Sequence, residues 1–284
     1  MEASVRDKIY ELFTDCVNRT LSRLANDDTN RPFHAALLSP EVVFWSRFER
    51  SFSTSFGQAV IEKISRIICE GSGATESACQ KDTLVSLTTV QWDEIETIAR
   101  ESRTGNSGYK PNWENDLERV LVAGRYGTPD TRRVRTDLFW VKDGVENFMS
   151  IKTVKPNLDQ TAEAKRDLLK IAADDSSRNV YFGLYYNPYG ETRESYKFSP
   201  PKRLFDFVND KPILLGADYW NTLGGIGTYE LILGIAEDVG MSTRALISGY
   251  GIENLARTGV SPADLTITAN DLKVNLSTER TRGI

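Results

Sequence analysis

An aspartate and a lysine fall at the same end of a predicted β-hairpin. Residues 133–142 and 146–154 are rich in β-branched and aromatic side chains, and they flank Asp143-Gly144, a dipeptide that favours a tight type I′ turn. Because side chains alternate along a strand, Asp137 and Lys152 then share one face. They lie diagonal to each other if the turn is centred on Asp143-Gly144, and directly opposite if the register slides by one residue on each strand.

This charged pair has two interpretations. Both faces of the hairpin are largely apolar, so it is expected to be buried, and a buried carboxylate and amine are costly unless they are paired or used. One interpretation is a cross-strand salt bridge. The other is a site for metal-dependent hydrolysis of phosphodiesters. There, Mg²⁺ bound by carboxylate oxygens activates water and neutralises charge on the phosphate, while a lysine holds or activates the nucleophile.

The elements around the hairpin predict an α/β protein. The spacing of apolar residues predicts a helix over 159–174, and 179–187 reads as a strand, so the second hairpin strand, the helix and this strand form a βαβ unit with parallel strands. The expected order is αβββαβ around a mixed central sheet, although no residues are assigned to the first strand. Further helices are expected at 6–25, 40–68 (in two pieces around 51–57), 87–100 and 113–123, and through much of 201–284.

The chain is expected to form a single domain. Its 284 residues would comprise a helical N-terminal part (1–112), a catalytic sheet core (113–187) and a mainly helical C-terminal part (188–284).

An aspartate on one strand, x-x-Lys on its hairpin partner, and a following helix and parallel strand resemble the layout of PD-(D/E)xK nucleases. Longer stretches resemble type II restriction endonucleases of the TdeIII family. The resemblance implies a restriction-endonuclease-like core and a homodimeric, Mg²⁺-dependent enzyme that cuts double-stranded DNA at a short palindromic site of the GGNCC type. The stretches are FERSFSTSFGQAVIEKI (48–64), RTDLFWVKDG (135–144), SIKTVKPN (150–157) and YWNTLGGIGTYELILGIAEDVG (219–240).

The resemblance implies roles for three residues. Asp137 matches the first metal-binding carboxylate, and Lys152 matches the catalytic lysine. Glu62, on the FGQAVIE stretch, matches a helix carboxylate that many such nucleases direct at the metal. The alternative for Glu62 is an exposed helix glutamate without a catalytic role.

One position departs from the family pattern. The second acidic residue of (D/E)xK is Ser150 in this sequence, so another carboxylate must complete the metal site. We expect Glu62 to supply it first and Glu163 second, with Asp167 one helical turn beyond Glu163. An inactive copy of the enzyme is the alternative that this serine leaves open.

Basic residues around the hairpin are the candidates for DNA contact. Residues 118–170 contain eleven basic and eight acidic residues, a local charge of +3 in a chain whose net charge is −5. Arginine suits guanine edges, asparagine suits adenine, and lysine suits phosphates. A solvated surface explains these side chains equally well. The candidates are Arg132, Arg133, Arg135, Lys155 and Asn157.

Composition excludes several other chemistries. A single histidine, His34, rules out sites that need two, and three dispersed cysteines argue against a disulfide framework or a structural zinc site. No signal peptide or bilayer-spanning run is visible, so a cytoplasmic protein is expected. The resemblance to restriction endonucleases implies a cognate DNA methyltransferase as the functional partner. The alternative functions are another PD-(D/E)xK nuclease, for repair or a mobile element, and a DNA-binding protein that has lost catalysis.

Overall fold

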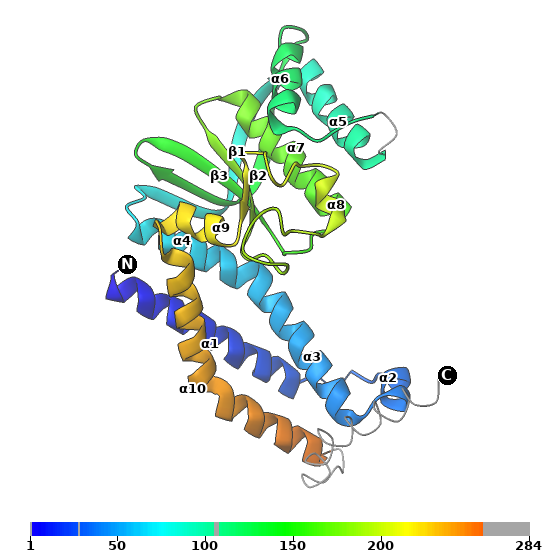
Figure 1. Cartoon of the computed structure of the whole chain (residues 1–284), viewed down its shortest axis with the longest axis vertical. Coiled ribbons are helices and arrows are strands. Elements are labelled where there is room, and N and C mark those ends of the chain that lie inside the picture. The colour runs from blue at the N-terminus through cyan, green and yellow to red at the C-terminus, as the bar shows by residue number, and fades with distance from the viewer. Residues whose placement is uncertain (1, 28, 105–107, 258–284) are drawn as a thin grey trace. The chain divides into compact units, whose positions relative to one another are not determined.

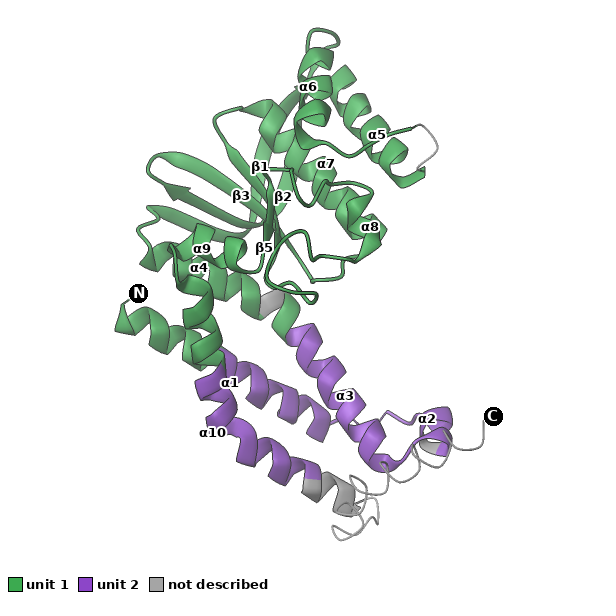
Figure 2. Cartoon of the chain, viewed as in Figure 1, with its two compact units in different colours: residues 1–12, 56–236 green, residues 13–55, 237–284 purple. Residues whose placement is uncertain are grey.

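The protein is described by a computed structural model that covers residues 2–27, 29–104 and 108–257. It divides into two compact units, Met1–Leu12 with Phe56–Ala236, and Phe13–Ser55 with Glu237–Ile284 (Figure 2). The candidate catalytic residues all belong to the first unit. The expectation of a single domain stays a prediction.

A five-stranded mixed sheet forms the centre of the first unit. The strands lie in the order β1-β2-β3-β4-β5; the first three are antiparallel, and β4 and β5 run parallel to β3. This arrangement confirms the expected α/β fold with a mixed central sheet. The strands are β1 (Glu76–Thr88), β2 (Pro129–Lys142), β3 (Val145–Lys152), β4 (Asn179–Leu184) and β5 (Ile213–Leu215).

The predicted hairpin is confirmed, including its register. Lys142 pairs with Val145 and Phe139 with Phe148, which is the register centred on Asp143-Gly144. Asp143 has φ 52° and Gly144 has φ 76°, as a type I′ turn requires at both central positions. The turn therefore fixes which residues of β2 and β3 face each other.

Helices cover both faces of the sheet (Figure 1). Helix α7 (Leu158–Asp174) packs on β1 to β4 and on α5 (Thr89–Thr104) and α6 (Trp113–Ala123), while α4 (Ile61–Gly71) packs on β1 and β2 and on α9 (Ala217–Gly224). Gly183 on β4 permits the close approach of α9, because a Cβ there would meet Met149 and Tyr219 side-chain atoms at 2.7 Å. The order α4-β1-β2-β3-α7-β4 confirms the expected αβββαβ arrangement, with α5 and α6 inserted between β1 and β2.

Two segments differ from expectation. Residues 76–88 form the first strand, to which the sequence analysis assigned no residues, and the helix expected from Leu87 begins after it, at Thr89. The long helical stretch expected over 40–68 consists of two helices joined by a π-helical turn. The first helix is α3 (Pro40–Ser55), and the turn η1 (Phe56–Val60) connects it to α4. The interruption thus overlaps the expected position at residues 56 and 57, and it ends two residues before Glu62.

The second unit is helical. Aromatic contacts join α3 to α10 (Thr228–Arg257), with the ring centroids of Phe44 and Tyr250 6.1 Å apart. Gly251 lies against Trp45, where a Cβ would come within 2.9 Å of the indole. In the part of the chain that the structure describes, no helix is both long and apolar enough to cross a membrane. The remaining helices are α1 (Ala3–Ala25) and α10, which each contribute to both units, α2 (Pro32–Leu37) in the second unit and α8 (Ser199–Lys202) in the first.

A buried ion pair fastens α7 to α6. The side chains of Lys165 and Asp116 are 0% and 3% exposed, and the Lys165 ammonium donates to the Asp116 carboxylate, to the Leu204 carbonyl and, at 2.8 Å, to the Tyr109 hydroxyl. Burial lowers the pKa of Lys165, and the charge of Asp116 opposes that shift. The pair therefore holds α7, which carries part of the candidate site, in one position.

We expect Asp116→Asn to lower the free energy of unfolding by about 3 kcal/mol or more, because the change leaves a buried ammonium without its counter-ion. Urea denaturation measures the effect. The matched control is Glu114→Gln on the same helix, which breaks an exposed ion pair with Lys211 and should leave stability unchanged. Equal stability of the two variants would contradict a stabilising role for the buried pair.

Candidate active site

The hairpin brings three donors to one oxygen of Asp137. Its Oδ2 accepts hydrogen bonds from the Ile151 backbone N–H at 2.7 Å, the Lys152 Nζ at 3.1 Å and the Ser150 hydroxyl at 3.2 Å. The side chains of Asp137 and Lys152 are 19% and 20% exposed. The predicted carboxylate–lysine pair is therefore present and partly open to solvent.

The ladder between β1 and β2 is interrupted at Asp137. Cys79 pairs with Leu138 and Lys81 with Thr136, but Gln80 and Asp137, which lie between these pairs, do not form a regular bridge. Gln80 has φ 53°, a left-handed conformation that costs a residue other than glycine on the order of 1–3 kcal/mol. Irregularities of this kind redirect side chains next to functional sites.

Both strands change faces at this interruption. Ala78 packs against the buried cluster that contains Val85, although regular alternation over seven positions would put them on opposite faces. On β2, Val134 and Phe139 belong to the same cluster and are five positions apart. Side chains therefore change faces between the two sides of the interruption, that is, between residues 76–79 and 81–88 of β1 and between residues 138–141 and 129–136 of β2. Gln80 and Asp137 lie at the point of change. We call residues 129–136 the outer half of β2.

The amide of Gln80 links Asp137 to Glu62. Its Nε2 donates to Glu62 Oε2 at 3.0 Å and to Asp137 Oδ1 at 3.2 Å. Glu62 lies in the first turn of α4, whose apolar side is buried through Ile61 and Ile64. Gln80 could not be selected from the sequence, because its role depends on a backbone conformation and a contact between distant segments.

The environment of Glu62 raises the pKa of its carboxyl group. Partial burial raises the pKa of the Glu62 carboxyl, and the nearby negative charge of Asp137 raises it further. The hydrogen bond from Gln80 and the positive charge of Lys152 oppose this shift. A divalent cation between the two carboxylates would therefore relieve an existing electrostatic repulsion.

The predicted catalytic and metal-binding residues line one cavity of about 430 Å³. Gly57, in the π-helical turn η1, borders it, so the irregular turn lies at the site. Glu163 is also on the lining, on an exposed position of α7, whereas Asp167 pairs with Lys170 at 2.8 Å and is not on the lining. The lining residues are Gly57, Glu62, Gln80, Asp137, Ile151, Lys152, Thr153, Gln160 and Glu163.

The donor set fits a magnesium ion that takes part of its coordination from water and phosphate. Mg²⁺ is commonly held by one or two carboxylates with substrate oxygens, and Glu62 and Asp137 provide two. Within residues 2–257, apart from the short undescribed gaps, no group of three His, Cys, Asp or Glu side chains is arranged to hold a metal. Ser150 donates to Asp137 and does not replace the missing carboxylate.

The candidate DNA contacts lie on two segments outside this cavity. Three arginines, Arg132, Arg133 and Arg135, lie on the outer half of β2, and their side chains are more than half exposed. Arg135 forms two hydrogen bonds with Asp82, at 2.7 and 3.0 Å, and Arg132 pairs with Asp130. Lys155 is exposed in the turn after β3, and Asn157 caps α7 by accepting from the Gln160 N–H. The structure therefore places these residues in two groups, Arg132, Arg133 and Arg135, and Lys155 and Asn157.

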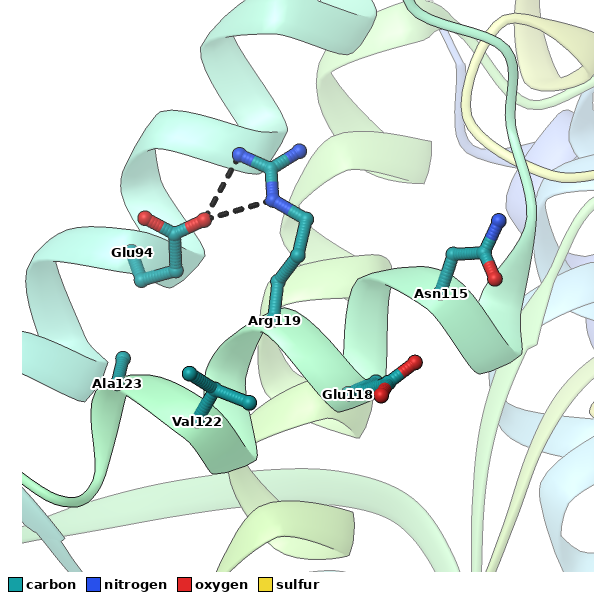
Figure 3. Close-up of a pocket in the computed structure, with 6 residues that line it drawn as sticks. All are labelled: Glu94, Asn115, Glu118, Arg119, Val122 and Ala123. Atoms are coloured by element: carbon teal, nitrogen blue, oxygen red, sulfur yellow. Dashed lines mark hydrogen bonds and ion pairs between the residues drawn. The ribbon is translucent and has the colours of Figure 1, made fainter.

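A second hollow, between α5 and α6, has different chemistry (Figure 3). Its one arginine, Arg119, is paired with Glu94 at 2.7 Å and with Glu101 at 2.9 Å. Because no lysine lines this hollow and a guanidinium does not give up its proton, the hollow lacks an ammonium group like that of Lys152.

Comparison with known proteins identifies the family of this chain. A family model described as "Type II restriction endonuclease, HinfI" matches residues 1–240. Among curated proteins of Herpetosiphon aurantiacus, the type II restriction enzyme HgiEI is 31% identical over 86% of this chain and 89% of its own length. The type II restriction enzymes HgiCII (30%, covering 82% and 85%) and HgiBI (31%, covering 80% and 83%) are similar. The chain therefore belongs to the HinfI family of type II restriction endonucleases, which are site-specific deoxyribonucleases.

Proposed function

We propose that this enzyme hydrolyses phosphodiester bonds of double-stranded DNA with Mg²⁺ at the cavity between α4, β1, β2, β3 and α7. The observation that carries the proposal is the connection of Asp137 to Lys152 directly and to Glu62 through Gln80. Two carboxylates beside an ammonium group match the needs of this reaction, since one part must bind a cation and another must hold a nucleophile.

Each residue has a distinct role in this proposal. Asp137 and Glu62 would hold the magnesium ion, which would supply Lewis-acid stabilisation of the phosphate when bound. Lys152 is held by Asp137, so its ammonium is positioned to orient the attacking water and to stabilise negative charge. Ser150 and the Ile151 N–H fix the direction of the Asp137 carboxylate. Glu163 stands at the cavity wall as a second source of a carboxylate oxygen.

We further propose that the enzyme acts as a homodimer on a short palindromic site. The resemblance to the TdeIII family suggests a GGNCC-like sequence, and run-off sequencing of digested plasmid DNA would identify it. A two-fold protein matches a two-fold sequence, and each subunit would cut one strand. Sedimentation of the DNA complex would measure the subunit number. A methyltransferase that protects the same site, in the cytoplasm, would complete the restriction–modification pair.

Asp137→Ala and Lys152→Ala are expected to lower cleavage by orders of magnitude while the fold and specific DNA binding persist. The reason is that each variant removes one half of the charged pair but leaves the hairpin turn intact. Plasmid cleavage with Mg²⁺ and mobility shifts with Ca²⁺ measure the two properties, with Lys142→Ala as the control.

The same assays distinguish the alternatives. Near-normal cleavage by either variant would exclude this site. Tight DNA binding without any cleavage by the wild type would favour the non-catalytic alternative. A smear of products instead of discrete bands would favour a repair or mobile-element nuclease.

The source of the second carboxylate is expected to appear in the magnesium dependence. Glu62→Gln should lose orders of magnitude in rate and require more Mg²⁺, because Glu62 is linked to Asp137 through Gln80. Glu163→Gln should have a smaller effect. Asp167→Asn is the control, since Asp167 already pairs with Lys170. Normal cleavage by all three variants would place the second ligand elsewhere.

Affinity for DNA is expected to fall more than about tenfold between 50 and 200 mM salt, as four or more phosphate contacts would require. The arginines on β2 are exposed, and exposed ion pairs such as Arg135–Asp82 yield readily to phosphate. Binding in Ca²⁺ measures the slope. Arg133→Ala and Arg135→Ala should each reduce it by about one contact per subunit, and Lys211→Ala should not. An unchanged slope in both arginine variants would exclude the outer half of β2 as a DNA surface.

A further inference from the structure

Gln80 occupies a position where its backbone alone would favour glycine. Its φ of 53° is in the left-handed region, which glycine adopts without strain, and the interruption of the β1–β2 ladder falls at this residue. A strained residue that persists at such a place indicates that its side chain is needed. That side chain reaches into the cavity and ends between Glu62 and Asp137.

The amide group stands where the two carboxylates converge. One nitrogen, Nε2, donates to an oxygen of each, at 3.0 Å to Glu62 and at 3.2 Å to Asp137. It therefore satisfies two negatively charged groups that would otherwise face each other. A cation held by the same two oxygens would remove the need for these hydrogen bonds, and the amide N–H groups would then point towards a positive charge.

The side-chain amide of Gln80 also carries an oxygen, Oε1, which suits the site when a metal ion is bound. The terminal torsion of glutamine is broad, so a turn about it exchanges the nitrogen for Oε1 at little cost. Carbonyl oxygens are ligands that hard divalent cations accept. A neutral oxygen from Gln80 would thereby add a ligand beside the carboxylates of Glu62 and Asp137.

We propose that Gln80 is a positioning residue with two states. With the metal absent, its amide nitrogen bridges Glu62 and Asp137 and holds them in place; with the metal bound, its amide oxygen is turned towards the cation. The proposal rests on the proposed function of the cavity, because it assumes that Glu62 and Asp137 are the metal-binding pair.

Two substitutions separate the two states. Gln80→Leu removes both the donor and the oxygen, and Gln80→Glu keeps an oxygen but removes the donor. Both are unbranched at Cβ, so the strain of the left-handed backbone is similar to that in the wild type. Thr83→Val, three residues along β1, is the matched control, because the Thr83 hydroxyl is buried without a hydrogen-bond partner.

The test measures binding of Mn²⁺ alone to the whole chain, by electron paramagnetic resonance without DNA, together with thermal unfolding in a chelator. We expect Gln80→Leu to bind Mn²⁺ about tenfold or more weakly and Gln80→Glu to bind at least as well as the wild type. In the chelator, both variants should unfold at a lower temperature than the wild type and Thr83→Val. Comparable loss of Mn²⁺ affinity in both variants would mean that Gln80 has only a structural role, and it would overturn the proposal. Normal Mn²⁺ affinity in Gln80→Leu would also overturn it. So would the absence of Mn²⁺ binding by the wild type at millimolar concentrations.

Plasmid cleavage keeps this result separate from the proposed function. If the wild type cleaves with Mg²⁺ and Asp137→Ala does not, the catalytic site stands, and unchanged Mn²⁺ affinity in Gln80→Leu overturns only the role of Gln80. If Asp137→Ala cleaves normally, the proposed function of the cavity fails, and the role of Gln80 falls with it.

Discussion

The hydrogen bonds to Asp137 are the interaction on which the rest of the site depends. One of its oxygens receives the Ile151 N–H, the Lys152 ammonium and the Ser150 hydroxyl, and the other receives the Gln80 amide. The donors come from two neighbouring strands on either side of β2. A single carboxylate therefore sets the relative positions of the lysine and, through Gln80, of the glutamate on α4. Such a partly buried group tolerates its charge because its lone pairs are occupied.

Fixing that carboxylate imposes a cost on the sheet around it. The β1–β2 ladder loses one regular pair at Gln80 and Asp137, and both strands turn over there. The inner part of β2 packs Phe139 against β3, whereas its outer part exposes Arg133 and Arg135. The same irregularity that presents the proposed catalytic groups thus also separates the apolar hairpin from the charged surface proposed for DNA.

The sequence predicted the elements with local signatures and missed those that depend on tertiary contacts. Asp143-Gly144 fixed the hairpin register, and that register placed Asp137 beside Lys152 correctly. The first strand could not be assigned from the sequence, because its side chains change faces of the sheet at Gln80. The alternation of apolar and polar residues that identifies a strand is therefore broken within residues 76–88. The interruption in the long N-terminal helical stretch was foreseen near its observed place, but nothing in residues 56–60 specified a π-helical turn. The bridge from Gln80 could not be inferred, because it joins positions that are 18 and 57 residues away in the chain.

Ser150 has a consequence for the order in which the complex assembles. With a serine at the second acidic position of the PD-(D/E)xK pattern, the cavity is lined by three carboxylates and one ammonium, Glu62, Asp137, Glu163 and Lys152, instead of four carboxylates and one ammonium. The cavity is then less negative before any metal arrives, and a DNA phosphate meets a smaller electrostatic barrier. We expect the metal-free protein to be able to bind and scan DNA, with affinity in a chelator close to that in calcium. Cutting would then wait for the ion, so the search for a site and the chemistry become separate events.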